Sequence, residues 1–241
     1  MSGATEKTVG ELALENPAAT RVFEKLGIDY CCGGGKTLAQ ACQAARVSID
    51  EATAALAAVS AGAAPAAPLR NWPAEPLSEL VAHILSTHHV YTRREIARLG
   101  PLFDKVCAVH EKNHPELSRL RDTFGGLAGE LTAHLMKEEM ALFPYIVRME
   151  EAVVAKQPVP PPPFGTVRDP VAAMMHEHDA AGSALRSMRE IASGYTAPPD
   201  ACASFQTLYR ALAALEADLH HHIHLENNLL FPRAIEMERA Q

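Results

Sequence analysis

The sequence predicts an all-α protein whose larger part is a four-helix bundle, and three observations lead to this fold class. Of its 241 residues 48% are apolar but only 5% are aromatic, and alanine recurs throughout. Alanine favours helix, whereas strands are enriched in β-branched and aromatic residues. Four long segments lack a strand pattern, and breaks at Gly100-Pro101, the proline-rich run 158–163 and Pro198-Pro199 separate them. These segments lie near residues 77–99, 117–149, 169–193 and 199–237.

A segment rich in alanine and proline, residues 61–76, divides the chain into two parts. Repeated prolines forbid helix and stiffen a linker. We therefore predict a small helical domain at 1–60, a linker at 61–76 and the four-helix bundle at 77–241. The linker is long enough for the small domain to approach the bundle or, in a homodimer, a second protomer.

The small domain carries two adjacent cysteines in the string DYCCGGGKT. Three successive glycines predict a loop, and Thr37 is a suitable cap for the helix that follows. Cys31 and Cys32 are therefore expected on an exposed turn, where the nearby helix N-terminus and Lys36 would lower a thiol pKa. A disulfide between neighbours would be strained, so we predict a catalytic thiol pair with a redox or metal-handling role.

Composition excludes several classes of function. The net charge is −7 without a long basic block, which argues against a nucleic-acid partner. No apolar stretch reaches the ~18–20 residues of a membrane helix, and the start of the chain does not resemble a secretory signal. We therefore expect a cytoplasmic protein with reduced thiols, and its odd number of cysteines does not indicate a disulfide framework.

An internal repeat in the sequence indicates where the metal-binding residues lie. The strings HLMKEEMALFP, starting at His134, and HIHLENNLLFP, starting at His222, share the pattern His-x3-Glu followed by Leu-Phe-Pro. His89 precedes the first copy by 45 residues, and His178 precedes the second by 44. The bundle is therefore interpreted as a duplicated helix pair, each pair offering one lone histidine and one His-x3-Glu.

Residues i and i+4 share a face of a helix, so each histidine of the repeat points the same way as its glutamate. Two divalent metals could each take two imidazoles while both carboxylates bridge them, with positions open for an oxo or hydroxo bridge, oxygen or nitric oxide. This donor set suits iron, manganese or zinc, and the lack of thiolate disfavours a structural zinc site. The predicted ligands are His89, His134, Glu138, His178, His222 and Glu226.

A single His-x3-Glu is commonly only a hydrogen-bonded surface pair, but two copies with matched upstream histidines favour metal. His88 competes with His89, and His176 with His178; the near-equal spacings favour His89 and His178. The roles of His220, His221 and His224 stay open, because adjacent helix positions point about 100° apart and cannot all face one site. The role of His110 also stays open; it lies in a loop region expected after Pro101, where a surface histidine is the favoured interpretation.

These motifs resemble a known family. The string VGELALENPAATRVFEKLGIDYCCGGGKTLAQAC resembles the short helical domain that opens the RIC (Repair of Iron Centres) proteins, and the two His-x3-Glu strings resemble the hemerythrin-like domain that follows it. The resemblance implies a cytoplasmic protein with two non-haem irons that helps to restore damaged iron–sulfur clusters. It implies the same six metal ligands, with Glu138 and Glu226 bridging, and matches Cys31 and Cys32 to the family's thiols.

Three functions follow as hypotheses. The first is iron donation to damaged or apo iron–sulfur proteins under nitrosative or oxidative stress. The second is enzymatic nitric oxide reduction at the two-iron centre. The third is a hemerythrin-like sensor or store of oxygen or nitric oxide, for which the thiols would be dispensable.

Overall fold

The computed structural model describes residues 6–62, 71–159 and 161–240. The regular elements of this part of the chain are helical, and one isolated bridge pairs Thr8 with Thr37. The predicted all-α class is confirmed. Of the predicted linker, 61–76, the stretch 63–70 lies outside the described residues, and the rest includes the short 3-10 helix η1, Trp72–Ala74. Within the described ranges, no helix combines the length and the apolar character needed to cross a bilayer.

The chain folds into two compact units. The first comprises Met1–Leu80, Met149–Val159 and His220–Gln241, as far as these are described, and the second comprises Val81–Arg148 and Pro160–Leu219. The boundaries cut through continuous helices, so one helix can contribute residues to both units.

Four short helices of the first unit surround a small apolar core. They are α2 (Val9–Glu15), α3 (Ala19–Leu26), α4 (Leu38–Ala45) and α5 (Ile49–Gly62). Thr8 with Glu11 and Thr37 with Gln40 form capping boxes, in which each side chain bonds the other residue's backbone N–H. Gly27 ends α3 in the left-handed conformation that glycine adopts without strain. Val9, Phe23, Tyr30, Leu38 and Cys42 are among the buried core residues.

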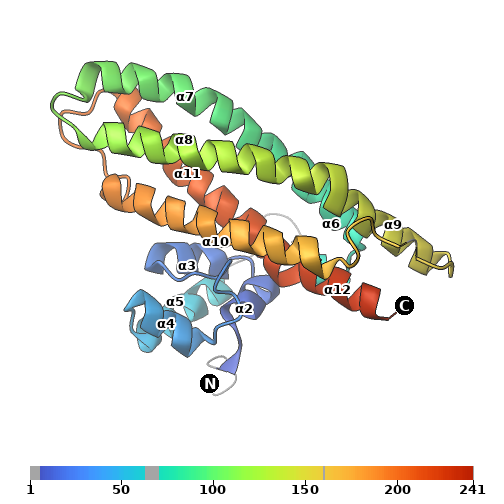
Figure 1. Cartoon of the computed structure of the whole chain (residues 1–241). Coiled ribbons are helices and arrows are strands. Elements are labelled where there is room, and N and C mark those ends of the chain that lie inside the picture. The colour runs from blue at the N-terminus through green and yellow to red at the C-terminus, as the bar shows by residue number, and fades with distance from the viewer. Residues whose placement is uncertain (1–5, 63–70, 160, 241) are drawn as a thin grey trace. The chain divides into compact units, whose positions relative to one another are not determined.

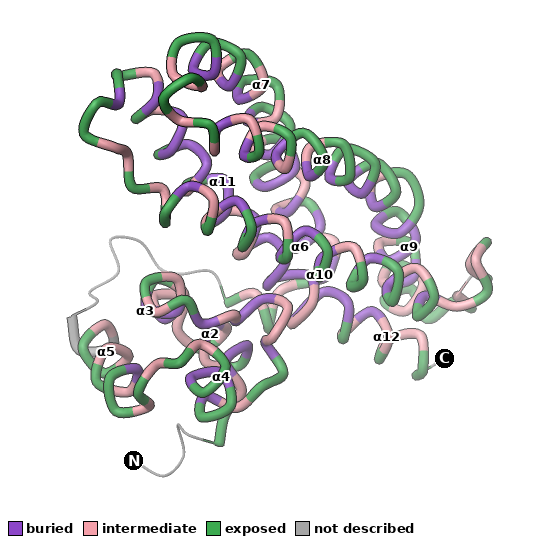
Figure 2. Tube along the Cα trace, turned by 60° about the vertical axis from the view of Figure 1, so that its left-hand side comes forward, coloured by how far each residue is buried: buried purple, intermediate pink, exposed green. Residues whose placement is uncertain are grey.

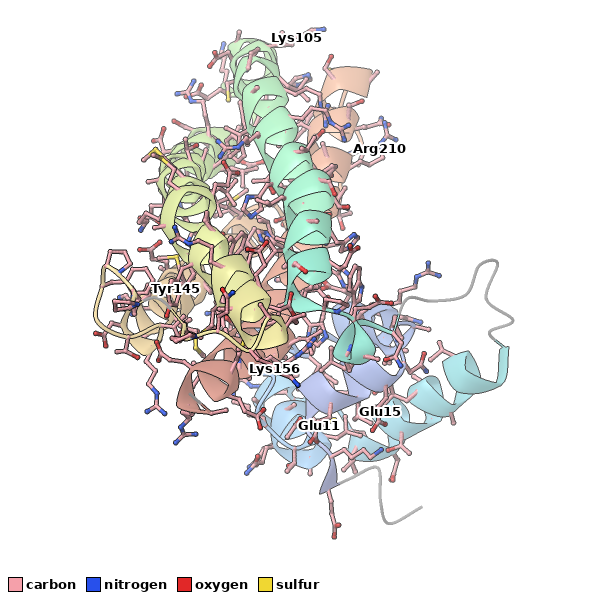
Figure 3. All side chains as sticks on the ribbon, turned by 90° about the vertical axis from the view of Figure 1, so that its right-hand side faces the viewer. Glu11, Glu15, Lys105, Tyr145, Lys156 and Arg210 are labelled. Atoms are coloured by element: carbon pink, nitrogen blue, oxygen red, sulfur yellow. The ribbon has the colours of Figure 1, made fainter. Side chains whose placement is uncertain are left out.

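The long helices form a bundle with a continuous apolar core (Figures 1 and 2). They are α7 (Val90–His110), α8 (Glu116–Lys137), α10 (Arg168–Ile191) and α11 (Ala203–Leu225), and α8 packs against both α7 and α10. Each helix buries one stripe, represented by Phe103, Phe124, Leu185 and Phe205. Charged side chains such as Lys105 occupy the exposed stripes (Figure 3).

Within the described residues, three π-helical turns interrupt the long helical runs. They are η2 (Leu85–His89), between α6 (Leu77–Ile84) and α7; η3 (Glu138–Leu142), between α8 and α9 (Phe143–Val154); and η4 (Glu226–Leu230), between α11 and α12 (Phe231–Arg239). The Leu-Phe-Pro strings begin at the last residues of η3 and η4, Leu142 and Leu230, and end at Pro144 and Pro232. Proline has no N–H, so Pro144 and Pro232 cannot bond the carbonyls four residues earlier, which lie in η3 and η4.

The predicted break at Gly100-Pro101 is wrong, because α7 continues through Pro101 to His110. A proline removes the hydrogen bond to the carbonyl four residues earlier, here that of Ala97. Ala97 lies on the exposed face of α7, where water can bond that carbonyl.

Candidate metal centre

The predicted metal ligands lie at or near the π-helical turns. His89 is the last residue of η2, while Glu138 and Glu226 are the first residues of η3 and η4. His134 and His222 stand one turn earlier, near the ends of α8 and α11, and His178 lies within α10. All six are buried; both glutamates are 0% exposed, and no histidine exceeds 4%.

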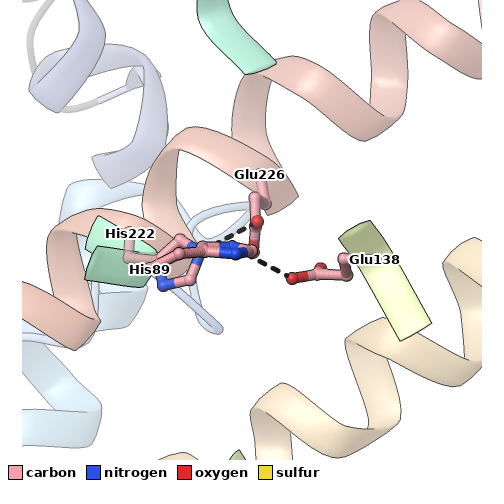
Figure 4. A group of neighbouring side chains, drawn as sticks. All are labelled: His89, Glu138, His222 and Glu226. Carbon is pink, nitrogen blue, oxygen red and sulfur yellow. Dashed lines mark hydrogen bonds and ion pairs between the residues drawn. The ribbon is translucent and has the colours of Figure 1, made fainter. Parts of the chain in front are cut away.

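The six side chains form two overlapping groups of donor atoms. The first contains His89, Glu138, His222 and Glu226, and the second contains His134, Glu138, His178 and Glu226; the ligand atoms of each group lie within 4.8 Å of one another. Figure 4 shows the first group, with the imidazoles directed at the carboxylates. Both groups share Glu138 and Glu226, as expected of bridging carboxylates.

Distances within these groups are those of atoms that can converge on a cation. The Nε2 atom of His89 lies 3.4 Å from one oxygen of Glu138, and that of His134 lies 3.4 Å from the other. His178 Nε2 lies 3.1 Å from His134 Nε2, and His222 Nε2 lies 2.9 Å from Glu226 Oε1. The two oxygens of Glu138 therefore face different imidazoles, as a bridging position requires.

Two outer glutamates orient the imidazoles. Glu139 Oε1 lies 2.8 Å from His89 Nδ1, and Glu177 Oε2 lies 2.9 Å from His134 Nδ1. When Nδ1–H donates to a carboxylate, the Nε2 atom carries the lone pair that a metal needs. Sequence reasoning missed Glu139 as an outer acceptor, although it directly follows Glu138.

Each outer carboxyl is held in its charged form. Burial disfavours the charge of Glu139, but hydrogen bonds from His89 and Arg93 outweigh it, so its pKa is lowered. Burial likewise disfavours the charge of Glu177, and hydrogen bonds from Lys137 and His134 lower its pKa.

The structure distinguishes the two histidines in each competing pair. His88 is buried but directs Nδ1 to Asp218 Oδ1 at 3.1 Å, and it belongs to neither donor group. His176 is exposed, one residue short of Glu177, whereas His178 is 2% exposed and joins the second group. The spacing of the repeat therefore selected the histidines that the fold brings together.

The additional histidines beside His222 contact the small helices of the same compact unit. His220 Nδ1 lies 2.7 Å from Glu24 Oε1, and the His224 ring lies 5.3 Å from that of Tyr30. Burial lowers the pKa of His224 to about 4, which keeps this imidazole neutral. His110 lies in another part of the bundle, against His114 and Phe205, with ring centroids 6.2 and 5.3 Å away.

The cysteine pair lies on a turn that Asp29 organises. Its Oδ1 atom accepts hydrogen bonds from the backbone N–H groups of Cys31, Cys32 and Gly33 at 3.2, 3.0 and 3.0 Å. The Cys31 Sγ lies 3.4 Å from the same oxygen and 3.8 Å from the Cys32 Sγ. Asp29, Cys31 and Cys32 thus form a third group of possible metal donors, and sequence reasoning missed Asp29.

The expected lowering of the thiol pKa is wrong for Cys31. Its hydrogen bond with Cys32, its burial and the charge of Asp29 raise the pKa of this thiol well above its usual range. Cys31 is 4% exposed, whereas Cys32 is half-buried. Thiolate at Cys31 therefore requires an opening of the turn or a cation.

Comparison with known proteins finds a match for each part of the chain. Residues 80–234 match the family model described as a hemerythrin HHE cation binding domain, and residues 5–60 match a domain of unknown function, DUF542. The iron–sulfur cluster repair protein YtfE of Pectobacterium carotovorum is 35% identical over 233 residues, which cover 97% of this chain and 98% of the relative. The protein of the same name from Cronobacter sakazakii is 37% identical over 235 residues, which cover 97% of this chain and 98% of the relative. The one from Escherichia coli O81 is 35% identical over 231 residues, which cover 95% of this chain and 97% of the relative.

The chain belongs to the RIC (Repair of Iron Centres) family. In this RIC protein the buried donors could hold metal ions. Buried carboxylates are costly unless positive charge compensates them, and Glu138 and Glu226 are both fully buried. Four imidazoles and two carboxylates without thiolate suit a borderline divalent cation, which would stabilise the charge of both carboxylates.

A cavity of about 330 Å³ in this RIC protein reaches two of the candidate ligands. It is lined by residues of α8 and α10, among them His134, Lys137, Glu177 and His178. This volume is large enough to admit a diatomic gas or a few waters beside these two side chains.

Proposed function

We propose that this protein restores damaged iron–sulfur clusters by donating iron from a centre of two non-haem irons. The proposed ligands are His89, His134, Glu138, His178, His222 and Glu226, with both glutamates bridging. The observation that carries the proposal is the pair of buried donor groups that share Glu138 and Glu226. The family supplies the biological task, because its curated relatives carry iron–sulfur cluster repair in their names.

The ligand types support donation. Imidazole and carboxylate ligands hold iron less tightly than the thiolates of a cluster site, so transfer toward an apo cluster protein runs from harder to softer donors. Bound iron supplies a transferable cation; the protein's own residues hold it, orient the imidazoles through Glu139 and Glu177, and keep the carboxylates charged. The donation pathway and the iron–sulfur clients belong to the proposal.

The two thiols are the proposed acceptors of iron as it leaves the two-iron centre. Cys31 and Cys32 lie in the segment that we assign to a separate domain, residues 1–60, joined by the linker 61–76 to the bundle domain 77–241. A cysteine thiol must lose its proton to bind iron as a thiolate, so transfer to this pair releases protons and is favoured at higher pH. A cytoplasmic setting, which we also propose, would keep both thiols reduced.

The test is iron transfer to an apo iron–sulfur enzyme in the presence of a chelator that captures free iron. Protein loaded with iron should restore the activity of the enzyme, and His178→Ala should abolish the transfer. His176→Ala is the matched control, because His176 is exposed and lies outside both donor groups. Failure of the iron-loaded wild-type protein to restore the cluster would refute donation.

The cavity that reaches His134 and His178 favours nitric oxide reduction as the second candidate function. The balanced reaction converts two NO, two electrons and two protons into N2O and water, with the electrons from an added reductant. Stopped-flow measurement of NO loss together with N2O detection decides it: one N2O per two NO over many turnovers supports reduction. Absence of turnover excludes it.

A sensor or store of oxygen or nitric oxide makes a different prediction. Reversible binding at the metal pair would continue unchanged in Cys31→Ala and Cys32→Ala. Loss of cluster repair in those variants, with gas binding retained, would favour iron donation over a role as a sensor or store.

A further inference from the structure

Asn228 contacts the backbone of the cysteine turn directly. It lies in η4, two residues after Glu226. Its Nδ2 atom donates to the carbonyl oxygen of Cys31 at 3.2 Å and of Tyr30 at 3.3 Å, and it lies 3.1 Å from His224 Nδ1. All these residues belong to one compact unit. The turn that carries both thiols is therefore tied to the helical segment that carries Glu226.

Two glycines make room for this side chain. A Cβ added to Gly34 would lie 2.1 Å from Asn228 Oδ1, and one added to Gly10 would lie 2.8 Å from the same atom. The N–H of Gly10 also donates to the carbonyl of Gly34 at 2.9 Å, which joins the first turn of α2 to the loop after the cysteines. Gly35 is different, because a Cβ there would meet no heavy atom within 4 Å.

The glycines therefore serve close approach, since neither Gly10 nor Gly34 has a positive φ. Only a residue without a Cβ lets the loop backbone reach the Asn228 amide. Asp29 shapes the turn from within, through three backbone N–H groups, while Asn228 holds it from outside through two carbonyls.

We propose that Asn228 is a positioning residue for the thiol pair, holding the Cys31-Cys32 turn closed against the segment that carries Glu226. This inference rests on the proposed role of the thiols as iron acceptors. The closed turn buries Cys31, and release of the Asn228 contacts is the local opening that exposes it. Because Asn228 and Glu226 share one π-helical turn, displacement of Glu226 would also displace the residue that holds the thiols.

The test is the alkylation rate of each cysteine in the full-length, metal-free, reduced protein, measured with iodoacetamide and peptide mass spectrometry. Asn228→Ala removes two hydrogen bonds, and we expect Cys31 to react at least about tenfold faster, equivalent to about 1.4 kcal/mol. Gly34→Ala should have a similar effect, because the new Cβ displaces the Asn228 side chain. Gly35→Ala is the matched control and should react at the wild-type rate.

Two further measurements separate positioning from general loosening. Gly34→Ala should have little additional effect in the Asn228→Ala background, because its steric conflict is with Asn228 itself. Cys42, buried in the core of the same small helices, and Cys107, buried in the bundle, should keep their wild-type rates in all variants. Cys202 is exposed and calibrates the reagent.

The inference is overturned if Cys31 alkylation in Asn228→Ala stays within twofold of wild type, or if Cys42 accelerates in parallel with it. Additive effects of Gly34→Ala and Asn228→Ala would also overturn it. A second readout concerns function: Asn228→Ala should keep the iron content and visible spectrum of the wild type while iron transfer changes in rate. If the wild-type protein donates no iron, the alkylation rates still decide the positioning role.

Discussion

Glu139 and Glu177 hold two of the proposed ligands from outside the donor groups, and changing them should weaken metal binding by a measurable amount. Each accepts a hydrogen bond from an imidazole Nδ1, at 2.8 Å from His89 and 2.9 Å from His134. Loss of such an outer carboxylate lowers metal affinity about 10- to 100-fold, or about 1.4–2.8 kcal/mol. Gln keeps an acceptor oxygen without the charge and should give the lower end of this range; Ala should give the upper end.

The assay is anaerobic competition for Fe²⁺ between the apo protein and a chromophoric chelator of known affinity. The series compares Glu139→Gln, Glu139→Ala, Glu177→Gln and Glu177→Ala with the wild type. Asp179→Asn is the control, because this exposed carboxylate follows His178 without contacting either orienting hydrogen bond. Wild-type affinity in both alanine variants would refute the orienting role, and equal losses for Gln and Ala would refute the graded effect of the acceptor.

Three other changes have defined outcomes. Two hydrogen bonds lower the pKa of the Cys202 thiol to about 7: the larger effect comes from the backbone N–H of Phe205 and the smaller from the His110 side chain. The alkylation rate of Cys202 should therefore be half-maximal near pH 7, and His110→Ala should move that midpoint upward. Phe205→Ala empties a fully buried position of the bundle core and should lower the free energy of unfolding in urea by about 3–5 kcal/mol; a loss below about 1 kcal/mol would contradict the packing. The pKa values of Glu139 and Glu177 lie below the ordinary 4.5, so both bind fewer protons folded than unfolded. Their stabilising contribution is complete above pH 4.5 and is lost as pH falls through the lowered values, so wild type should lose more stability on acidification than the double Gln variant.

The repeat in the sequence was sufficient to predict which six residues come together. The i, i+4 spacing places His134 with Glu138 and His222 with Glu226 on one helix face, and the matched spacings then select one histidine on each partner helix. The ligand role of the six residues stays a prediction. The all-α class followed equally well, since composition and helix caps are local properties of the chain.

Features that depend on which side chains and carbonyls the fold buries or exposes were not predictable. The break expected at Pro101 did not occur, because the freed carbonyl of Ala97 faces solvent and costs little. The thiol pKa was predicted from the nearby helix N-terminus, whereas burial and the neighbouring Cys32 and Asp29 side chains dominate at Cys31. Asn228 had no signal of its own, since only the fold brings it to Gly34.

The central claim is a centre of two irons on the six predicted ligands, and metal content measured together with the visible spectrum tests it most directly. Anaerobically loaded wild-type protein and His176→Ala should each hold two irons per chain with the near-ultraviolet absorption of a bridged pair. His178→Ala should lose that absorption and hold fewer than two. Zinc alone in the wild type, or two irons with an unchanged spectrum in His178→Ala, would contradict it.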